Sequence, residues 1–352
     1  MWTINLASAQ RRTRSKFLLV GLAIALPLCV LLGLGSGAVS LSVGELISGL
    51  SNTLSGNAGG QATLIVGHIR LPRVALAALM GAILGMSGAA TQGLFRNPLA
   101  DPSLIGVTAG ASLGAAFVIV LGGNLLQGYA ALSAVSTGAF LGGAVAVIFV
   151  YRLATSTNGT SVATMLLAGI ALTALAGALT SLLEFYADND MLRRISLWKM
   201  GGMDGASYPR LLLATIVGIA LLTALPRYAA TLNALLLGES EARHLGIDVD
   251  RAKIAIIAWV AVGVGTSVAL VGTIAFVGLV VPHIVRMLVG PDHRVLLPAS
   301  ALAGATLLVV ADTLARVVLA PTELPVGIIT AIIGVPFFIS LLRQRHHYGM
   351  QA

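Results

Sequence analysis

The fold class is decided by one stretch, residues 70–94, with the sequence RLPRVALAALMGAILGMSGAATQGL. After Arg73 it runs for 21 residues without a charged side chain. About 20 consecutive apolar residues are enough for an α-helix to cross the roughly 30 Å hydrocarbon core of a bilayer. Small residues recur at four-residue spacing, at Gly81, Gly85 and Ala89, and such spacing lets helix backbones approach closely. The stretch therefore predicts a membrane-spanning helix that packs tightly against another helix.

The whole chain shares this apolar character. Of its 352 residues, 57% are hydrophobic and only 10% are charged, and the mean hydropathy is +0.96. A soluble globular domain carries roughly 25% charged residues. The composition therefore excludes a soluble enzyme, a nucleic-acid-binding protein and a disordered chain, despite the net charge of +8. It predicts an all-α fold, a polytopic membrane helix bundle with no nucleic-acid partner.

Apolar runs between charges and turn residues predict ten transmembrane helices. They cover 17–36, 72–94, 104–122, 130–151, 161–184, 210–226, 254–273, 277–289, 297–319 and 326–342. An even number of crossings places both termini on the same side of the membrane. The eighth run has only about 13 residues, which fits a half-crossing or a helix buried among others better than a lipid-facing span.

The basic residues predict the orientation of the bundle. If the N-terminus is cytoplasmic, 14 Lys and Arg residues lie on the inner side and 7 on the outer side. The positive-inside rule then places both termini in the cytoplasm. The expected organisation is a cytoplasmic segment 1–16, a ten-span domain 17–342 and a cytoplasmic tail 343–352. The first 36 residues also resemble a signal peptide, but no clear A-x-A site follows the apolar run, so we expect an uncleaved first span.

Two arginines stand at the entrance of the second span, on the predicted outer side. Arg70 and Arg73 are three residues apart and hence lie on one helical face. One interpretation is anchoring, in which the long side chains reach back to the membrane surface. The other is docking of an extracytoplasmic partner, because guanidinium groups bind carboxylates in bidentate fashion. Spacing alone leaves both interpretations open.

Few charged residues lie inside the predicted spans, and their number indicates which energy source could drive transport. The candidates are Glu184 near the end of the fifth span, and Asp312 with Arg316 in the ninth, an i, i+4 pair that can neutralise itself. Without a string of carboxylates, an ion-coupled secondary transporter is poorly supported. None of the lysines ends a G-x-x-x-x-G-K-[ST] loop, so ATP-driven transport would need a separate ATPase subunit.

The longest polar interruption on the predicted inner side is 233–253. Its centre, GESEARHLG (238–246), is competent to form a helix and is bounded by glycines. A helix outside the membrane can be a lid, a surface anchor or a contact for a partner protein. A partner is the attractive interpretation because the chain has no energy source of its own.

The sequence predicts neither a metal site nor a catalytic centre. His283 and His293 are ten residues apart, but no cysteine or carboxylate pattern accompanies them. A membrane-embedded enzyme would need a convergent nucleophile and base, and no such pair is visible. No cofactor and no enzymatic activity are expected.

Long, ordered motifs link the chain to a known family. They are RLPRVALAALMGAILGMSGAATQGLFRNPLADPSLIGVTAGASLGAA (70–116), LLLGESEARHLGI (235–247), residues 272–316 and ELPVGIITAIIGVPFF (323–338). These motifs resemble the iron-complex and vitamin B12 permease family (FecCD type), the ten-span membrane subunits of type II ABC importers. The resemblance implies a homodimer with the translocation path on its axis, two ATPase subunits on the inner side and one periplasmic binding protein on the outer side.

The resemblance also implies roles for individual residues. The coupling helices, which contact the ATPase, correspond to about 235–250, with contacts expected at Gly238, Glu239, Ala242, Arg243 and Gly246. Arg70, Arg73 and Arg316 match arginines that meet glutamates of the binding protein, which favours the docking interpretation. The fifth span resembles the pore-lining helix, with Thr173, Thr180 and Ser181 on the wall of the path.

The expected cytoplasmic gate departs from the family pattern. A vitamin B12 permease of this family has a Ser-Thr-Ser run just before its fifth span. Alignment on Leu166–Gly169 places Ser161, Val162 and Ala163 there instead. The loop 156–164 is therefore the expected gate region, although individual gate residues do not carry over.

The function implied by the resemblance is that of a permease subunit in a bacterial inner membrane. It would import an iron chelate, either a siderophore or haem, with ATP hydrolysed by another subunit. Cobalamin is the alternative cargo within the family. An ion-coupled secondary transporter is the alternative from another class.

Overall fold

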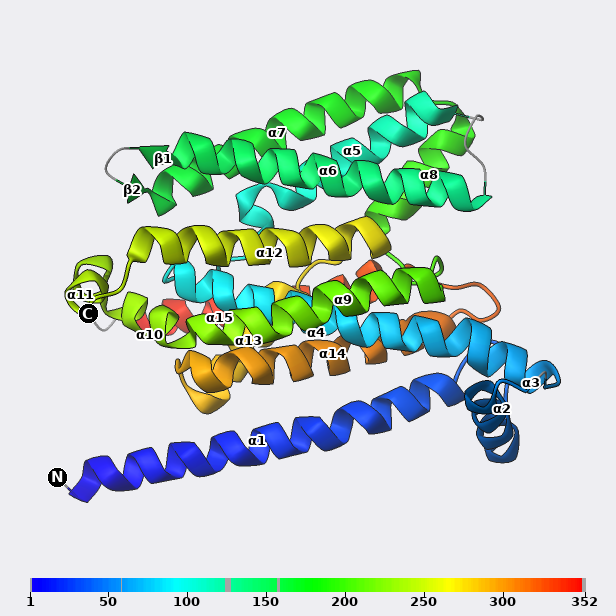
Figure 1. Cartoon of the computed structure of the whole chain (residues 1–352), viewed down its shortest axis with the longest axis horizontal. Coiled ribbons are helices and arrows are strands. Elements are labelled where there is room, and N and C mark those ends of the chain that lie inside the picture. Colours follow the sequence, from blue (N-terminus) through cyan, green and yellow to red (C-terminus); the bar gives the residue numbers. More distant parts are fainter. Residues whose placement is uncertain (1, 58, 124–127, 157–158, 350–352) are drawn as a thin grey trace.

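The computed structural model describes residues 2–57, 59–123, 128–156 and 159–349, and nearly all of them are helical. Figure 1 shows most of the long helices side by side along the long axis of the molecule. The predicted all-α helix bundle is therefore confirmed. The chain is a multi-pass membrane protein, because many of these helices are long and apolar.

The elements follow one another with short connections. The helices are α1 (Trp2–Gly35), α2 (Val43–Ser55), α3 (Gln61–Thr63), α4 (Leu71–Leu94), α5 (Val107–Gly122), α6 (Gly128–Ala154), α7 (Val162–Tyr186), α8 (Asn189–Met200), α9 (Tyr208–Ala224), α10 (Ala229–Leu237), α11 (Glu239–His244), α12 (Val249–Val271), α13 (Val277–Val289), α14 (His293–Val317) and α15 (Val326–Gly349). A π-helical segment, Leu64–Arg70, joins α3 to α4 without a break, and short 3-10 turns cover Pro102–Ile105 and Leu225–Tyr228. Strands β1 (Thr155–Ser156) and β2 (Gly159–Thr160) pair antiparallel between α6 and α7.

Each of the ten predicted spans coincides with a helix. Within the described residues, seven helical stretches are long and apolar enough to cross a membrane, and α5, α13 and the apolar part of α15 are shorter. The 13-residue α13 has the bounds predicted for the short eighth span. Ten full crossings therefore stay a prediction, while ten apolar helices are observed.

Several elements differ from the sequence-based expectation. The segment expected before the first span continues α1 back to Trp2, and α15 runs past residue 342 to Gly349. Met1 and residues 350–352 of the expected tail lie outside the described residues. Helices α2 and α8 and the β1–β2 hairpin were not predicted, because they are short and lie in polar connections.

The bundle has two distinct ends. Helix α1 begins and α15 ends at the end that also carries α11 and the hairpin, on the left in Figure 1. Helices α2, α3 and α8 lie at the opposite end. We call these the α11 end and the α8 end. The shared end of α1 and α15 is consistent with an even number of crossings.

Helix α4 lies at the centre of the bundle and packs most closely against α14. A Cβ atom built at Gly81 would lie 2.2 Å from the backbone oxygen of Gly304, and one at Gly85 would lie 2.2 Å from that of Ser300. Only glycine allows such an approach of one backbone to another. The pair α5 and α6 repeats the arrangement at Gly110, Gly114, Gly138 and Gly142. The small-residue spacing predicted this tight packing correctly.

Candidate functional site

Helix α11 lies beyond the end of α10 and the beginning of α12, at the left of the bundle in Figure 1. It is bounded by Gly238 and Gly246, whose φ angles are +123° and +81°. Only glycine adopts such angles readily, so these two residues set the turns into and out of the helix. Both were predicted as ATPase contacts, and that role stays a prediction.

Two ion pairs fasten α11 to the start of α12. The Glu239 carboxylate lies 2.6 Å from the Lys253 ammonium, and the Arg243 guanidinium lies 2.8 Å from the Asp250 carboxylate. The hydrogen bond to Asp250 raises the pKa of Arg243. Ala242 is completely buried between these pairs and belongs to the packing of the segment, not to its exposed face. Three of the five predicted contact residues therefore have internal roles.

The exposed apolar residues of this segment were not predicted from the sequence. Leu237 and Leu245 flank α11, and their side chains are 70% and 65% exposed. Leu245 lies outside the apolar helices that a bilayer would cover, and Leu237 is the last residue of one of them. Leucines exposed beside a short polar helix are a signal for a protein contact. The leucines on either side of the charged stretch in LLLGESEARHL could have indicated this contact.

The predicted gate residues lie at the start of α7. The Ser161 hydroxyl accepts a hydrogen bond from the Thr164 backbone N–H at 3.3 Å and so caps the helix. Val162 is the first residue of α7, and Ala163 is exposed. The residues before them form the β1–β2 hairpin where the sequence predicted a loop. That these residues close a path stays a prediction.

A groove of about 890 Å³ lies between α5 and α7. All three residues predicted for the wall of the path, Thr173, Thr180 and Ser181, line it from α7. Hydroxyl side chains face it from the other wall, at Ser103, Thr108 and Ser112. Most of α7 is exposed in the single chain, and a wall of hydroxyls is poorly suited to contact with lipid tails. We call this feature the α5–α7 groove.

One charged side chain lines the groove, and it is neutralised. Lys199, near the end of α8, forms an ion pair of 2.6 Å with Glu184, near the end of α7. The rest of the lining consists of small, apolar and hydroxyl-bearing residues. A wall of this kind offers no strong fixed charge to hold a solute.

The three arginines predicted to dock a binding protein are buried. Arg70, Arg73 and Arg316 are only 4%, 7% and 4% exposed. Asp312 lies between two of them, 2.9 Å from Nε of Arg73 and 3.1 Å from Nε of Arg316. Glu323 forms a second ion pair with Arg73 at 2.6 Å. These five residues, here called the arginine cluster, join α4, α14 and the segment before α15.

The cluster also holds the end of α1. Arg316 donates hydrogen bonds to the backbone oxygens of Gly33 and Ser36, at 2.9 and 2.8 Å. Arg70 donates to the backbone oxygens of Leu34 and Gly35, at 2.8 and 3.0 Å, and to that of Val39. All three guanidinium groups are thus bound within the chain. Docking through them stays a prediction, and it would require an internal acceptor to be exchanged for an external carboxylate.

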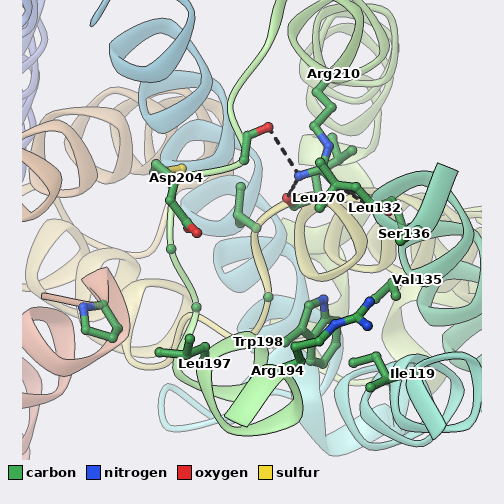
Figure 2. Close-up of a pocket in the computed structure, with 18 of the residues that line it drawn as sticks. Ile119, Leu132, Val135, Ser136, Arg194, Leu197, Trp198, Asp204, Arg210 and Leu270 are labelled. Atoms are coloured by element: carbon green, nitrogen blue, oxygen red, sulfur yellow. Dashed lines mark hydrogen bonds between the residues drawn. The ribbon is translucent and has the colours of Figure 1, made fainter. Parts of the chain in front are cut away.

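A second cavity, of about 640 Å³, opens at the α8 end between α5, α6, α8, α9 and α12. Figure 2 shows Arg210 entering it from α9, where it donates to the Leu270 backbone oxygen at 2.9 Å and to Ser136 at 2.8 Å. Arg73 and Glu323 of the arginine cluster also line the cavity. We call it the outer cavity, because it lies on the predicted outer side.

Arg194 is the exception among the arginines of the outer cavity. Figure 2 shows its guanidinium group near the apolar side chains Trp198, Val135 and Ile119. Within the residues that the structure describes, Arg194 has no hydrogen-bond or ion-pair partner. A guanidinium group beside apolar walls and without a counterion favours binding of a carboxylate.

The two histidines considered as metal ligands have other partners. Nδ1 of His283 lies 3.2 Å from the Pro98 backbone oxygen, and Nδ1 of His293 lies 2.9 Å from the Asn233 side-chain oxygen. Among the described residues, no three of His, Cys, Asp and Glu come together as a metal site would require. His283 thus contacts the connection after α4, and His293 contacts helix α10.

Comparison with known proteins identifies the family. The FecCD transport family matches residues 18–344. The chain is 48% identical over 287 residues to the cobalamin import system permease protein BtuC of Halobacterium salinarum, which covers 81% of this chain and 74% of the relative. It is 44% identical over 330 residues to the hemin transport system permease protein HmuU of Yersinia pestis, with 92% and 96% covered.

A solved structure supports the same assignment. It is an inward-facing conformation of a metal-chelate type ABC transporter, with a TM-score of 0.80, 33% sequence identity, and coverage of 94% of this chain and 99% of that one. Because it covers 94% of this chain, the match extends over nearly the whole bundle. The chain therefore belongs to the FecCD transport family, the membrane-spanning permease subunits of ABC importers, in which a separate subunit hydrolyses ATP.

Proposed function

We propose that this protein is the homodimeric permease of an ABC importer that carries an iron chelate, a siderophore or haem, across a bacterial inner membrane. The α11 end would face the cytoplasm and two ATPase subunits, as the 14 to 7 distribution of basic residues suggests. The α8 end would face a periplasmic binding protein. Each part of this proposal rests on a particular surface of the single chain.

The observation that carries the proposal is the α5–α7 groove. It is about 890 Å³ in volume, lined by hydroxyl and small side chains, and open along the exposed face of α7. A second copy placed against α7 would close the groove into a path and remove its hydroxyls from lipid. Such a wall makes weak contacts with many solutes, which suits passage of a large chelate whose affinity resides in another subunit.

The cargo is tested by uptake into proteoliposomes that contain the permease, its ATPase and its binding protein. Cyanocobalamin, haemin and a ferric hydroxamate are supplied separately. We expect ATP-dependent uptake of haemin or the ferric hydroxamate. Selective uptake of cyanocobalamin would favour the alternative cargo, which the similarity to the cobalamin permease of Halobacterium salinarum supports. Uptake that persists without ATP and collapses with an uncoupler would contradict the proposal.

The ATPase contact is proposed to centre on the two exposed leucines beside α11. Leu237 and Leu245 are the most exposed apolar residues of 235–250. The core of a protein interface is depleted of charge and rich in apolar contact, so these side chains would be buried against the ATPase. Gly238 and Gly246 would set the helix in place between them.

We predict that Leu245→Asp weakens assembly with the ATPase at least about tenfold, because it places a charge in the core of the contact. The measurement is the amount of ATPase retained on immobilised permease in nanodiscs. Ser240→Asp is the matched control, since Ser240 is exposed on α11 but lies about 140° around the helix from position 245. If wild type and Leu245→Asp retained equal amounts of ATPase, Leu245 would not be part of the interface.

The binding-protein contact is proposed to use the outer cavity as well as the arginine cluster. Charge reversal at Arg70 or Arg73 would break internal bonds, so it would not separate docking from folding. Arg194 has no internal bond to lose among the described residues, which makes it the better probe. An acidic side chain of the binding protein would enter the cavity and meet this guanidinium group.

We predict that Arg194→Glu weakens association of the binding protein about tenfold or more at low salt, with a smaller loss at high salt. Arg193→Glu is the control, because Arg193 is the next residue, is exposed, and does not line the outer cavity. The affinity is measured by surface plasmon resonance with permease in nanodiscs. Similar losses for both variants would indicate a general charge effect and not docking into the cavity.

A further inference from the structure

A buried lysine near the start of α12 has no role in the groove or in the exposed face of α11. The Lys253 side chain is only 2% exposed. Its ammonium group lies 2.6 Å from the Glu239 carboxylate and donates a hydrogen bond of 3.0 Å to the Thr160 backbone oxygen. A buried ammonium group needs a counterion and hydrogen-bond acceptors, and these two contacts supply both.

The two partners of Lys253 belong to different functional regions. Glu239 is the first residue of α11, which is proposed to contact the ATPase. Thr160 ends β2 and directly precedes Ser161, the residue that caps α7. One side chain therefore connects the ATPase-facing helix to the beginning of the helix that lines the groove. Figure 1 shows α11, the hairpin and the start of α12 at the same end of the bundle.

A second contact runs parallel to the first. Arg243, one turn after Glu239 on α11, pairs with Asp250, one turn before Lys253 on α12. Asp250 in turn lies against β2, because a Cβ atom at Gly159 would be only 2.9 Å from its Oδ1. Since the charges alternate along both helices, a shift of α11 by one turn would bring like charges together. The pairs therefore hold α11 in one register on α12.

We infer that Lys253 is a positioning residue that transmits displacement of α11 to the beginning of α7, with the Asp250 contact beside it. The inference rests on the proposed function in one respect, namely that an ATPase subunit displaces α11. Because the link consists of one ion pair and one hydrogen bond in series, α11 cannot move away from α12 without pulling on the Thr160 peptide or breaking the link. Coupling through such a network has typical magnitudes of roughly 5- to 150-fold.

The link itself is tested in the permease alone, in nanodiscs. Spin labels are placed at the exposed positions Ser240 and Ala163 by substitution with cysteine, in a Cys29→Ala background. Their distance distribution is measured by double electron–electron resonance. We expect Lys253→Met to broaden or shift the distribution and Lys253→Arg to retain it, because arginine can donate to both acceptors. A distribution unchanged in Lys253→Met would overturn the inference.

The consequence for transport is tested with Lys253→Met, which removes the donor to the Thr160 oxygen and leaves every residue of α11 unchanged. Lys253→Arg is the matched control, because arginine can donate to both acceptors. We expect substrate imported per ATP to fall about tenfold in Lys253→Met and to be retained in Lys253→Arg. Unchanged import per ATP would show that the ion pair is merely structural. Failure of the wild-type complex to import with ATP would instead count against the proposed function.

Discussion

Asp312→Ala is expected to destabilise the folded protein by about 3–5 kcal/mol, the magnitude found when one partner of a buried ion pair is removed. Asp312 is completely buried between Arg73 and Arg316, so its loss leaves two buried guanidinium groups close together. Glu323 neutralises Arg73 only from the more exposed side. The expected result is a greatly reduced yield of monodisperse protein and a lowered midpoint of thermal unfolding in detergent.

Two variants of the same cluster serve as references. Glu323→Gln removes a carboxylate that is 41% exposed, and we expect an effect within about 1 kcal/mol. Asp312→Asn keeps the shape and one acceptor oxygen and should fall between the two. If Asp312→Ala unfolded at the same temperature as wild type, the cluster would not be part of what holds α1, α4 and α14 together.

Gly81→Val is expected to prevent the normal packing of α4 on α14. A Cβ atom at this position would lie 2.2 Å from the Gly304 oxygen and 2.8 Å from the Ala305 Cα. Both neighbours are backbone atoms, so no side chain can rotate away and the two helices must separate. Overpacking of this kind costs about 1–3 kcal/mol and more where the surroundings cannot relax. Thermal unfolding and size-exclusion chromatography would measure the loss.

The matched control for this substitution is Gly21→Val. Gly21 lies in α1 and is exposed, and a Cβ atom at this position would have nothing within 4 Å. The same addition of volume should therefore leave the unfolding midpoint within the scatter of wild type. An equal effect of both substitutions would point to helix propensity, and not to the contact between α4 and α14.

The positions of the membrane helices could be predicted because they depend on local sequence alone. Apolar runs predicted 277–289 for α13 and 72–94 for α4, which begins at Leu71 and ends at Leu94. By contrast, α8 carries three basic residues and lies in a polar connection, so no apolar run marks it. Short elements of this kind are stabilised by caps and tertiary contacts, as at Asp188, which caps α8.

The candidate site was predictable where partners are close in sequence. The i, i+4 pair of Asp312 and Arg316 was expected and is present at 3.1 Å. The partner of Arg73 in the same cluster is 239 residues away, and no spacing rule connects them. The same limit applies to Lys253 and Thr160, which are 93 residues apart. The sequence pattern places Arg73 near a membrane surface. Only the tertiary fold shows that Asp312 of the same chain is its counterion.

The ion pair between Arg73 and Asp312 can form only late in synthesis, because the two residues are 239 positions apart. At about 5–20 residues per second, a ribosome needs roughly 10 to 50 s to add the 239 residues between them. During that interval Arg73 must find acceptors in water or among lipid headgroups, because its buried counterion does not yet exist. The beginning of α4 is therefore expected to remain near the membrane surface until α14 is made. The nascent chain is thus most exposed to quality-control proteases before this late helix arrives.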